Sequence, residues 1–416
     1  MEPRRILIFS LMYLPFVGGA ELAVKEITDR INPSEMEFDM ITLRADSTLP
    51  IVERMGNITI HRIGPSKRGM SHQDLKRFPW YFIKILYPIL AARKALSLHK
   101  TKPYDAMWSL MTYMGFPAVL ARMFGMKVPF ILTLQDGDTV EHITSRRRIR
   151  FVSPLLKKIF RDTACVQAIS NFLADFARAM GHTKKVVVIP NGVTISQYLA
   201  VSSDSVERVK GELKKKDDEI FLVTTSRLVE KNGITDVISA LPLLPENIRF
   251  ILCGEGPLLD TLQQQAKDLG VRERIIFLGN MSRELLPSYL HASDIFIRPS
   301  LSEGLGSSFL EAMAAGLPVI ATPVGGIPDF LFDVEEYGDK ATGVFCEVHN
   351  PENIAFAVKR LIQDVGMRQR ISQNGRALVV EKYDWDIVAR SMKDTLESVS
   401  LGEVSSYYKK ESNKEK

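Results

Sequence analysis

Two glutamates, Glu303 and Glu311, stand eight positions apart in a stretch that reads IFIRPSLSEGLGSSFLEAMAAGLPVIATPVGG over residues 295–326. Glu303 lies in a predicted loop whose glycines can adopt backbone angles that are closed to other residues. The loop and the start of the following helix offer free backbone N–H groups, which suit an anion. Because a carboxylate repels a phosphate, each glutamate is better suited to accept hydrogen bonds from hydroxyls. We therefore expect one to hold a sugar and the other a ribose.

Glu311 also has a purely structural interpretation. The pattern Ser308-x-x-Glu311 is that of a capping box, in which the serine caps the helix start and the glutamate bonds back to it. The spacing alone leaves both roles open for Glu311. Glu303 has no comparable structural explanation.

Two cations, Arg227 and Lys231, form a second candidate group. They follow a predicted strand at 219–225 and precede a helix predicted to begin at Gly233. Two cations on one turn can clamp a diphosphate, and the alternative is a surface ion pair with Glu230. A third group is Gly18 and Gly19, between the first predicted strand and the first helix, where backbone amides can face an anion.

These groups need a scaffold of short apolar strands that alternate with helices. Continuous apolar strands of this kind are typical of parallel sheets covered on both faces. Ligands of open α/β sheets bind beyond the carboxyl ends of the strands. Polar residues follow the predicted strand at 129–135 in this position, beginning with Gln135 and Asp136. The predicted strands are 4–10, 38–43, 58–62, 106–109, 129–135, 164–169, 184–189, 219–225, 249–253, 275–278, 295–298 and 317–321.

The stretch around Glu303 and Glu311 resembles the Glu-x7-Glu signature of glycosyltransferase family 4, also called glycosyl transferases group 1. The segment SRLVEK at 226–231 and the Pro-x-x-Gly-Gly-x-Glu pattern at 15–21 resemble two further motifs of that family. The resemblance spans about residues 4 to 398 and implies a retaining sugar transferase of the GT-B fold. This is an α/β architecture of two Rossmann-like domains that face each other across a cleft.

The resemblance also implies a division of the chain. Residues 1–204 would form the acceptor-binding domain and 205–384 the nucleotide-sugar-binding domain. A helix at 385–401 would cross back to pack on the first domain. The polar tail at 402–416 is expected to be disordered.

The resemblance assigns roles to the candidate residues. Arg227, Lys231 and Glu303 are the expected catalytic residues. Gln135 and Asp136 are expected to contact the acceptor or the sugar, although Gln135 stands where the family commonly has a histidine and cannot be a general base. No nucleophile is assigned, because the leaving phosphate can take the acceptor proton. The expected nucleotide-sugar-binding residues are Gly18, Gly19, Arg227, Lys231, Leu278, Glu303, Gly304, Leu305, Gly306 and Glu311.

No metal or other cofactor is expected. Asp136 and Asp138 spell Asp-x-Asp, which holds a divalent metal in the other large transferase fold, but the surrounding sequence lacks that fold's context. The cysteines at 165, 253 and 346 lie far apart in apolar runs, which favours a reducing compartment such as the cytoplasm. The sequence shows no signal peptide at its start and no membrane-spanning apolar run.

Charge is distributed unevenly along the chain. Residues 1–200 contain 28 Lys+Arg and 16 Asp+Glu, a net charge of +12, and the remaining residues carry −7 of the overall +5. A basic first half predicts an acidic partner, here an anionic membrane surface or a phosphorylated acceptor rather than nucleic acid.

The segment 66–100 mixes aromatic and basic residues, as an interfacial helix does. It could equally be an ordinary helix with its aromatic face in the core, and Pro79 and Pro88 are expected to interrupt it.

The sequence therefore predicts transfer of a sugar from a UDP- or GDP-sugar to a hydroxyl of a glycan or lipid-linked acceptor, in the cytoplasm or peripherally on the inner face of the membrane. One alternative is a GT-B sugar-nucleotide epimerase, which would need further histidines and acids that the sequence does not show. The other is a non-catalytic nucleotide-sugar-binding scaffold. The intact set of Arg227, Lys231, Glu303 and Glu311 argues against it.

Overall fold

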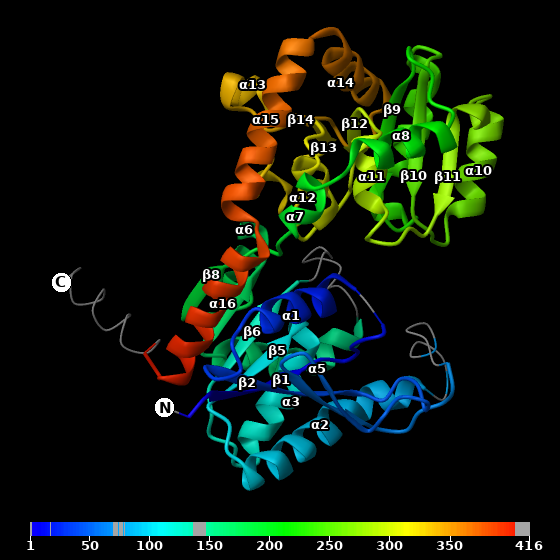
Figure 1. Ribbon diagram of the computed structural model, residues 1–416. Coiled ribbons are helices and arrows are strands. Elements are labelled where there is room, and N and C mark those ends of the chain that lie inside the picture. Colours follow the sequence, from blue (N-terminus) through cyan, green and yellow to red (C-terminus); the bar gives the residue numbers. More distant parts are fainter. Residues whose placement is uncertain are drawn as a thin grey trace. The chain divides into compact units, whose positions relative to one another are not determined.

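The computed structural model describes residues 2–16, 18–69, 74, 78, 80–135 and 147–403. The chain forms two compact units, each built around a sheet with helices on it (Figure 1). Unit 1 joins Met1–Pro190 to Trp385–Lys416, and unit 2 is Asn191–Asp384. The division falls earlier than the boundary expected after residue 204, because the helices at Ile195–Leu199 (α7) and Ser203–Glu212 (α8) pack on helices of unit 2.

The sheet of unit 1 has eight strands in the order β3-β4-β2-β1-β5-β6-β7-β8. All neighbours are parallel except β3, which pairs with β4 as an antiparallel edge hairpin. The seven parallel strands correspond to the predicted ones, and β3 was not predicted. The bounds are β1 Arg4–Phe9, β2 Met36–Leu43, β3 Val52–Met55, β4 Ile58–Ile63, β5 Ala106–Leu110, β6 Phe130–Leu134, β7 Cys165–Ala168 and β8 Lys185–Val188.

Helices cover this sheet, and one of them corrects an expectation. The helix at Tyr81–Thr101 (α2) continues through Pro88 instead of stopping there. Its neighbour Tyr87 is fully buried and its hydroxyl donates to the carbonyls of Ser10 and Ile41 at 2.7 and 2.9 Å, which ties the helix to the sheet. Pro79 lies outside the described residues. The other helices are α1 Gly19–Asp29, α3 Met111–Met123, α5 Arg147–Asp162, α6 Asn171–Ala179 and α16 Trp385–Ser400.

The last helix, α16, belongs to unit 1 although it follows unit 2 in the sequence. Trp385, Val388 and Met392 are buried in the same hydrophobic core as Ile6 and Ile8 of β1. The helix therefore closes the core of unit 1 with a segment from the far end of the chain.

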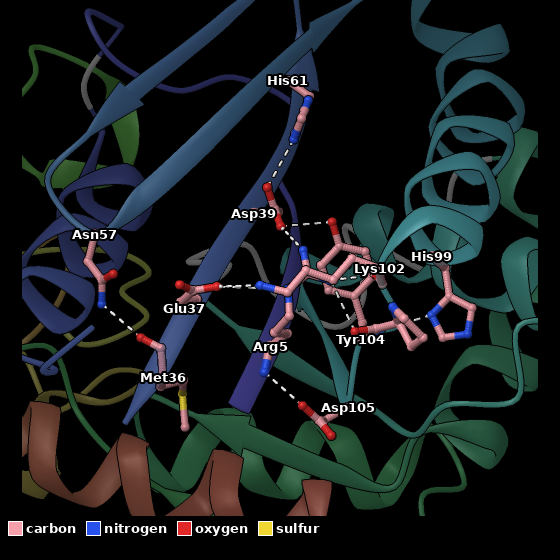
Figure 2. A network of polar contacts seen from close by, with 11 residues as sticks. Arg5, Met36, Glu37, Asp39, Asn57, His61, His99, Lys102, Tyr104 and Asp105 are labelled. Carbon is pink, nitrogen blue, oxygen red and sulfur yellow. Dashed lines mark hydrogen bonds and ion pairs between the residues drawn. The ribbon is translucent and has the colours of Figure 1, made fainter. Parts of the chain in front are cut away.

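A polar network links strands β1, β2 and β4 of unit 1 to the segment directly before β5 (Figure 2). Asp39 of β2 accepts from Arg5 of β1 at 2.8 Å and from Tyr104 at 2.9 Å, and His61 of β4 lies 3.0 Å from its other oxygen. Burial alone would raise the pKa of Asp39, but its bonds to His61 and Tyr104 and the charge of Arg5 hold that pKa below its ordinary value. We interpret this network as structural, because its bonds join neighbouring strands of one sheet to one another.

The sheet of unit 2 has six parallel strands in the order β11-β10-β9-β12-β13-β14. The strands are β9 Ile220–Thr225, β10 Ile248–Cys253, β11 Ile275–Gly279, β12 Ile295–Arg298, β13 Val319–Ala321 and β14 Val344–Phe345. The remaining helices are α9 Ile234–Ala240, α10 Leu259–Asp268, α11 Leu286–His291, α12 Ser307–Ala314, α13 Val334–Tyr337, α14 Pro351–Gln363 and α15 Val365–Lys382. Two Rossmann-like α/β units confirm the predicted fold class.

Candidate active site

The candidate residues of unit 2 lie in loops at one edge of its sheet. Strand β9 lies between β10 and β12, and β13 is the next neighbour of β12. Since these strands are parallel, the loops that follow them leave the sheet at the same carboxyl edge. The loop after β9 carries Arg227 and Lys231, and the loop after β12 carries Glu303. The strand order thus brings the two cations and the glutamate to adjacent loops.

Backbone contacts fix the spacing of these two loops. The amide of Leu301 donates to the carbonyl of Lys231 at 2.7 Å. Gly233, at the end of the β9 loop, has a φ of +66°, and a Cβ there would lie 1.9 Å from the carbonyl oxygen of Pro299. A larger residue at 233 would therefore push the loops apart. Glycine at this position is needed to hold Lys231 beside the β12 loop.

The turn after β13 supports Glu303 in a similar way. The amide of Gly326 donates to the carbonyl of Glu303 at 3.2 Å. A Cβ on Gly325, whose φ is +58°, would lie 1.8 Å from that same carbonyl oxygen. The glycine pair at 325–326 thus packs directly under the backbone of the candidate catalytic glutamate.

Arg298, which the sequence did not single out, holds the side chain of Glu303. It ends β12, is only 5% exposed, and donates to Glu303 Oε2 at 2.6 Å. It also donates to the hydroxyls of Ser300 and Ser308 at 3.1 and 2.6 Å, and its guanidinium lies over the Phe309 ring. Burial lowers the pKa of Arg298, and the nearby Glu303 and Glu311 oppose that shift. The signal that could have found it is a lone charge at the carboxyl end of an otherwise apolar, buried strand.

The helix after this loop, α12, decides between the two interpretations of Glu311. Its N-cap is Gly306, with a φ of +88° and no side-chain cap. The hydroxyl of Ser308 is engaged by Arg298 instead of by the helix start. The capping-box interpretation of Glu311 is therefore wrong, because Ser308 lies inside the helix and is not its N-cap residue. The other oxygen of Glu303 accepts from the amide of Gly304 at 3.1 Å, and Leu305 is buried.

Glu311 is a half-buried carboxyl beside positive charge. Burial raises its pKa to about 7, and the charges of Arg283 and Arg298 act in the opposite direction. A ligand that donates hydrogen bonds to the carboxylate, as a pair of ribose hydroxyls does, stabilises its ionised form.

Arg227 and Lys231 are available to a ligand. Arg227 is exposed and Lys231 half-buried, and within the described part of the chain neither has a carboxylate within ion-pair distance. The alternative surface pair with Glu230 is not formed. The loop itself is held by Asn232, whose side-chain amide donates to the carbonyl of Arg227 at 2.6 Å.

Two buried hydroxyls beside these cations also lack partners. Thr225 Oγ1 and Ser226 Oγ, at the end of β9, have no hydrogen-bond partner among the described residues. A buried hydroxyl without a partner costs free energy, which a polar ligand can recover by bonding to it. Leu278, the expected neighbour of the nucleotide base, is half-buried near the carboxyl end of β11.

The remaining candidates belong to unit 1. The amide of Gly18, at the start of α1, donates to the carboxylate of Glu21 at 2.9 Å, while a side chain at Gly19 would meet nothing within 4 Å. Gln135 is half-buried directly after β6. Asp136 and Asp138 lie outside the described residues. Among the residues that are described, no cluster of three or more histidines, cysteines or acids could hold a metal ion.

Known proteins resemble this chain over both units. A family model described as Glycosyl transferases group 1 matches residues 205–378, and one described as Glycosyl transferase 4-like domain matches residues 18–192. Uncharacterized glycosyltransferase MJ1607 of Methanocaldococcus jannaschii is 24% identical over 93% of this chain and 96% of its own length. The GDP-mannose-dependent alpha-(1-6)-phosphatidylinositol monomannoside mannosyltransferase of Mycobacterium tuberculosis is 30% identical over 58% of this chain and 64% of its own length.

A solved structure supports the fold. The crystal structure of Anabaena Alr3699/HepE in complex with UDP and glucose matches with a TM-score of 0.75 and 20% sequence identity. The match covers 95% of this chain and all of that one. At this level of identity the match establishes a common architecture.

Proposed function

We propose that this chain moves a sugar from a UDP- or GDP-sugar to a hydroxyl of a glycan or lipid-linked acceptor, with retention at the anomeric carbon. The chain belongs to the glycosyl transferases group 1 and is a glycosyltransferase of the GT-B fold. The observation that carries this proposal is the pairing of two loops at one sheet edge. One loop presents the unpaired cations Arg227 and Lys231, and the other presents Glu303, held by Arg298. Cations suit the diphosphate and the carboxylate suits the sugar hydroxyls.

The proposed reaction breaks the bond between the anomeric carbon and the β-phosphate oxygen and forms a bond from that carbon to the acceptor oxygen. Negative charge develops on the β-phosphate, where Arg227 and Lys231 stabilise it. The acceptor proton passes to the leaving phosphate, so no protein base is required. The loss of one such donor typically costs about 3–4 kcal/mol in barrier height.

The carboxylates position the donor in this scheme. Glu303 accepts hydrogen bonds from hydroxyls of the transferred sugar, and Glu311 accepts them from the ribose. Leu278 lies against the base. In unit 1, Gln135 and Asp136 hold the sugar or the acceptor through hydrogen bonds. No metal ion takes part.

The acceptor is proposed to be lipid-linked, with the enzyme in the cytoplasm and bound peripherally to the inner face of the membrane. Two observations support this: the +12 net charge of residues 1–200 and the mycobacterial relative, whose name describes a phosphatidylinositol monomannoside as its acceptor. The arginines at 146, 147, 148 and 150 add to that charge, although Arg146 lies outside the described residues. Within the described residues, no helix is long and apolar enough to span a bilayer.

The test is donor recognition followed by turnover. A thermal-shift panel of UDP-, GDP- and ADP-sugars identifies the donor, and slow hydrolysis of that donor without acceptor shows a transferase site. NMR of the transfer product reports the anomeric configuration of the new glycosidic bond, which should match that of the donor. Binding without any turnover would indicate a scaffold, and an altered sugar that remains linked to its nucleotide would indicate an epimerase.

A further inference from the structure

The outward face of helix α2 in unit 1 carries a stripe of large apolar side chains. Four side chains on this face are 48–55% exposed, namely Phe82, Ile85, Leu86 and Ile89. Their spacing of three, four and seven residues places them on one face of the helix. Phe78, 83% exposed, extends the stripe by packing edge-on against Phe82 with ring centroids 6.0 Å apart.

The stripe lies on a different face of α2 from the residues that pack the helix into unit 1. Ile83, Tyr87, Ala91 and Ala95 are buried, and α2 packs against α3 and β2. The expectation that the aromatic residues of this segment pack in the core therefore holds for Tyr87 but not for Phe78 or Phe82. Single exposed apolar residues are normal on protein surfaces, whereas a contiguous apolar patch marks a surface that binds something.

The charge around the stripe indicates what it binds. Helix α2 contains Lys84, Arg93, Lys94 and Lys100 and no aspartate or glutamate. Arg93 is exposed and follows Ile89 by one helical turn on the same face. Trp80, half-buried, stands directly before the helix. Phenylalanine, leucine and isoleucine on one face, with tryptophan and cations at its ends, fit the boundary between headgroups and acyl chains.

We propose that the outward face of α2 (Phe78, Phe82, Ile85, Leu86 and Ile89) inserts into the headgroup region of an anionic membrane, with the helix lying parallel to the surface. This inference rests on the proposed function, since a lipid-linked acceptor is what the enzyme would meet there. It differs from attraction by charge alone, because insertion removes apolar surface from water and is not screened by salt. Binding then has a salt-sensitive part from the cations and a salt-resistant part from the stripe.

The test compares the full chain with a Phe82→Ser/Leu86→Ser variant on vesicles of phosphatidylglycerol. The matched control is Phe356→Ser, because Phe356 is a similarly exposed phenylalanine, at 63%, on α14 of unit 2. We expect the double variant to lose about tenfold in partition coefficient for each side chain, which corresponds to about 1.4 kcal/mol each. The control should bind as the unaltered protein does, and some binding of the unaltered protein should persist at about 1 M NaCl.

Tryptophan fluorescence gives a second readout of depth. Trp108 and Trp385 are buried, at 1% and 3% exposure, so quenching by brominated phosphatidylglycerol reports on Trp80 beside the stripe. Quenching of the unaltered protein that the double substitution removes would support insertion. The proposal is overturned if the double variant binds vesicles as tightly as the unaltered protein. It is also overturned if neither protein binds vesicles and the double substitution instead dissociates a dimer in sedimentation.

These outcomes separate this inference from the proposed reaction. Vesicle binding needs no donor, and the thermal-shift response to nucleotide sugars needs no vesicle. Normal donor binding without membrane insertion would refute the role of α2 and leave the proposed reaction standing. Membrane insertion without any response to nucleotide sugars would refute the proposed donor and leave the role of α2 standing.

Discussion

Glu311 offers the sharpest test of the candidate site, because its ionisation links stability, donor binding and pH. Burial raises its pKa from an ordinary 4.5 to about 7. The folded protein therefore holds this proton more tightly than the unfolded chain, and the unfolding free energy falls as pH rises from 4.5 to 7. At about 1.36 kcal/mol for each unit of pKa difference, the charged carboxylate costs at most about 3 kcal/mol above pH 7.

The substitution Glu311→Gln removes this proton-linked cost while keeping the size of the side chain. We expect the variant and the unaltered protein to have similar unfolding free energies near pH 4.5. Above pH 7 the variant should be more stable, by up to about 3 kcal/mol. Urea unfolding of both proteins at several pH values measures this difference, and the other titrating groups cancel in the comparison.

Donor binding should show the opposite pH trend. Ribose hydroxyls donate to an ionised carboxylate better than to a protonated one, so the donor affinity of the unaltered protein should rise as pH increases through 7. The Glu311→Gln variant should bind the donor more weakly above pH 7 and without this dependence. Parallel pH profiles of stability for the two proteins would refute the reasoning, since Glu311 would then titrate as a solvated carboxyl.

Three further predictions test the rest of the site. Arg227→Ala and Lys231→Ala should each lower turnover by about 10²–10³-fold with little change in unfolding free energy, and near-normal turnover in either variant would remove the diphosphate clamp. Arg298→Met should lower the unfolding free energy by about 3–5 kcal/mol, because it breaks a buried pair with Glu303, and should also lower turnover. Arg298→Lys should recover part of both, and full activity of the methionine variant would show that Glu303 needs no support. Turnover should persist in excess EDTA, and a strict requirement for Mg²⁺ or Mn²⁺ would contradict the metal-free scheme.

Strands that are buried on both faces could be predicted from the sequence, because burial requires an uninterrupted apolar run. Strand β1 at Arg4–Phe9 and strand β12 at Ile295–Arg298 are of this kind. Strand β3, Val52–Met55, was not predicted because it is an edge strand with two exposed residues, so its sequence VERM contains no such run. The expectation that Pro88 interrupts its helix was wrong because it considered only the local sequence. The tertiary contacts of Tyr87 outweigh the local cost of a proline, and those contacts come from residues far away in the sequence.

Residue types and local spacing predicted the members of the candidate site, but not how they lie relative to one another. Glu303, Arg227 and Lys231 were found because each stands in a loop directly after a strand. Their mutual placement depends on β9 and β12 being neighbours in the sheet, which the order of the strands along the chain does not reveal.

Ser308 shows how a partner can reverse an interpretation. Its spacing to Glu311 matches that of a capping box, and only the three-dimensional structure shows that the N-cap is Gly306 and that Arg298 donates to the Ser308 hydroxyl. A buried guanidinium requires several acceptors. Arg298 finds side-chain acceptors in Ser300, Glu303 and Ser308, and a backbone acceptor in the carbonyl of Thr225 on β9. One buried cation therefore fixes the carboxylate that is proposed to hold the sugar and also bonds to the first turn of α12. Arg298 bonds to Glu303 and its charge opposes the raised pKa of Glu311, so its substitution should change the surroundings of both glutamates of the signature.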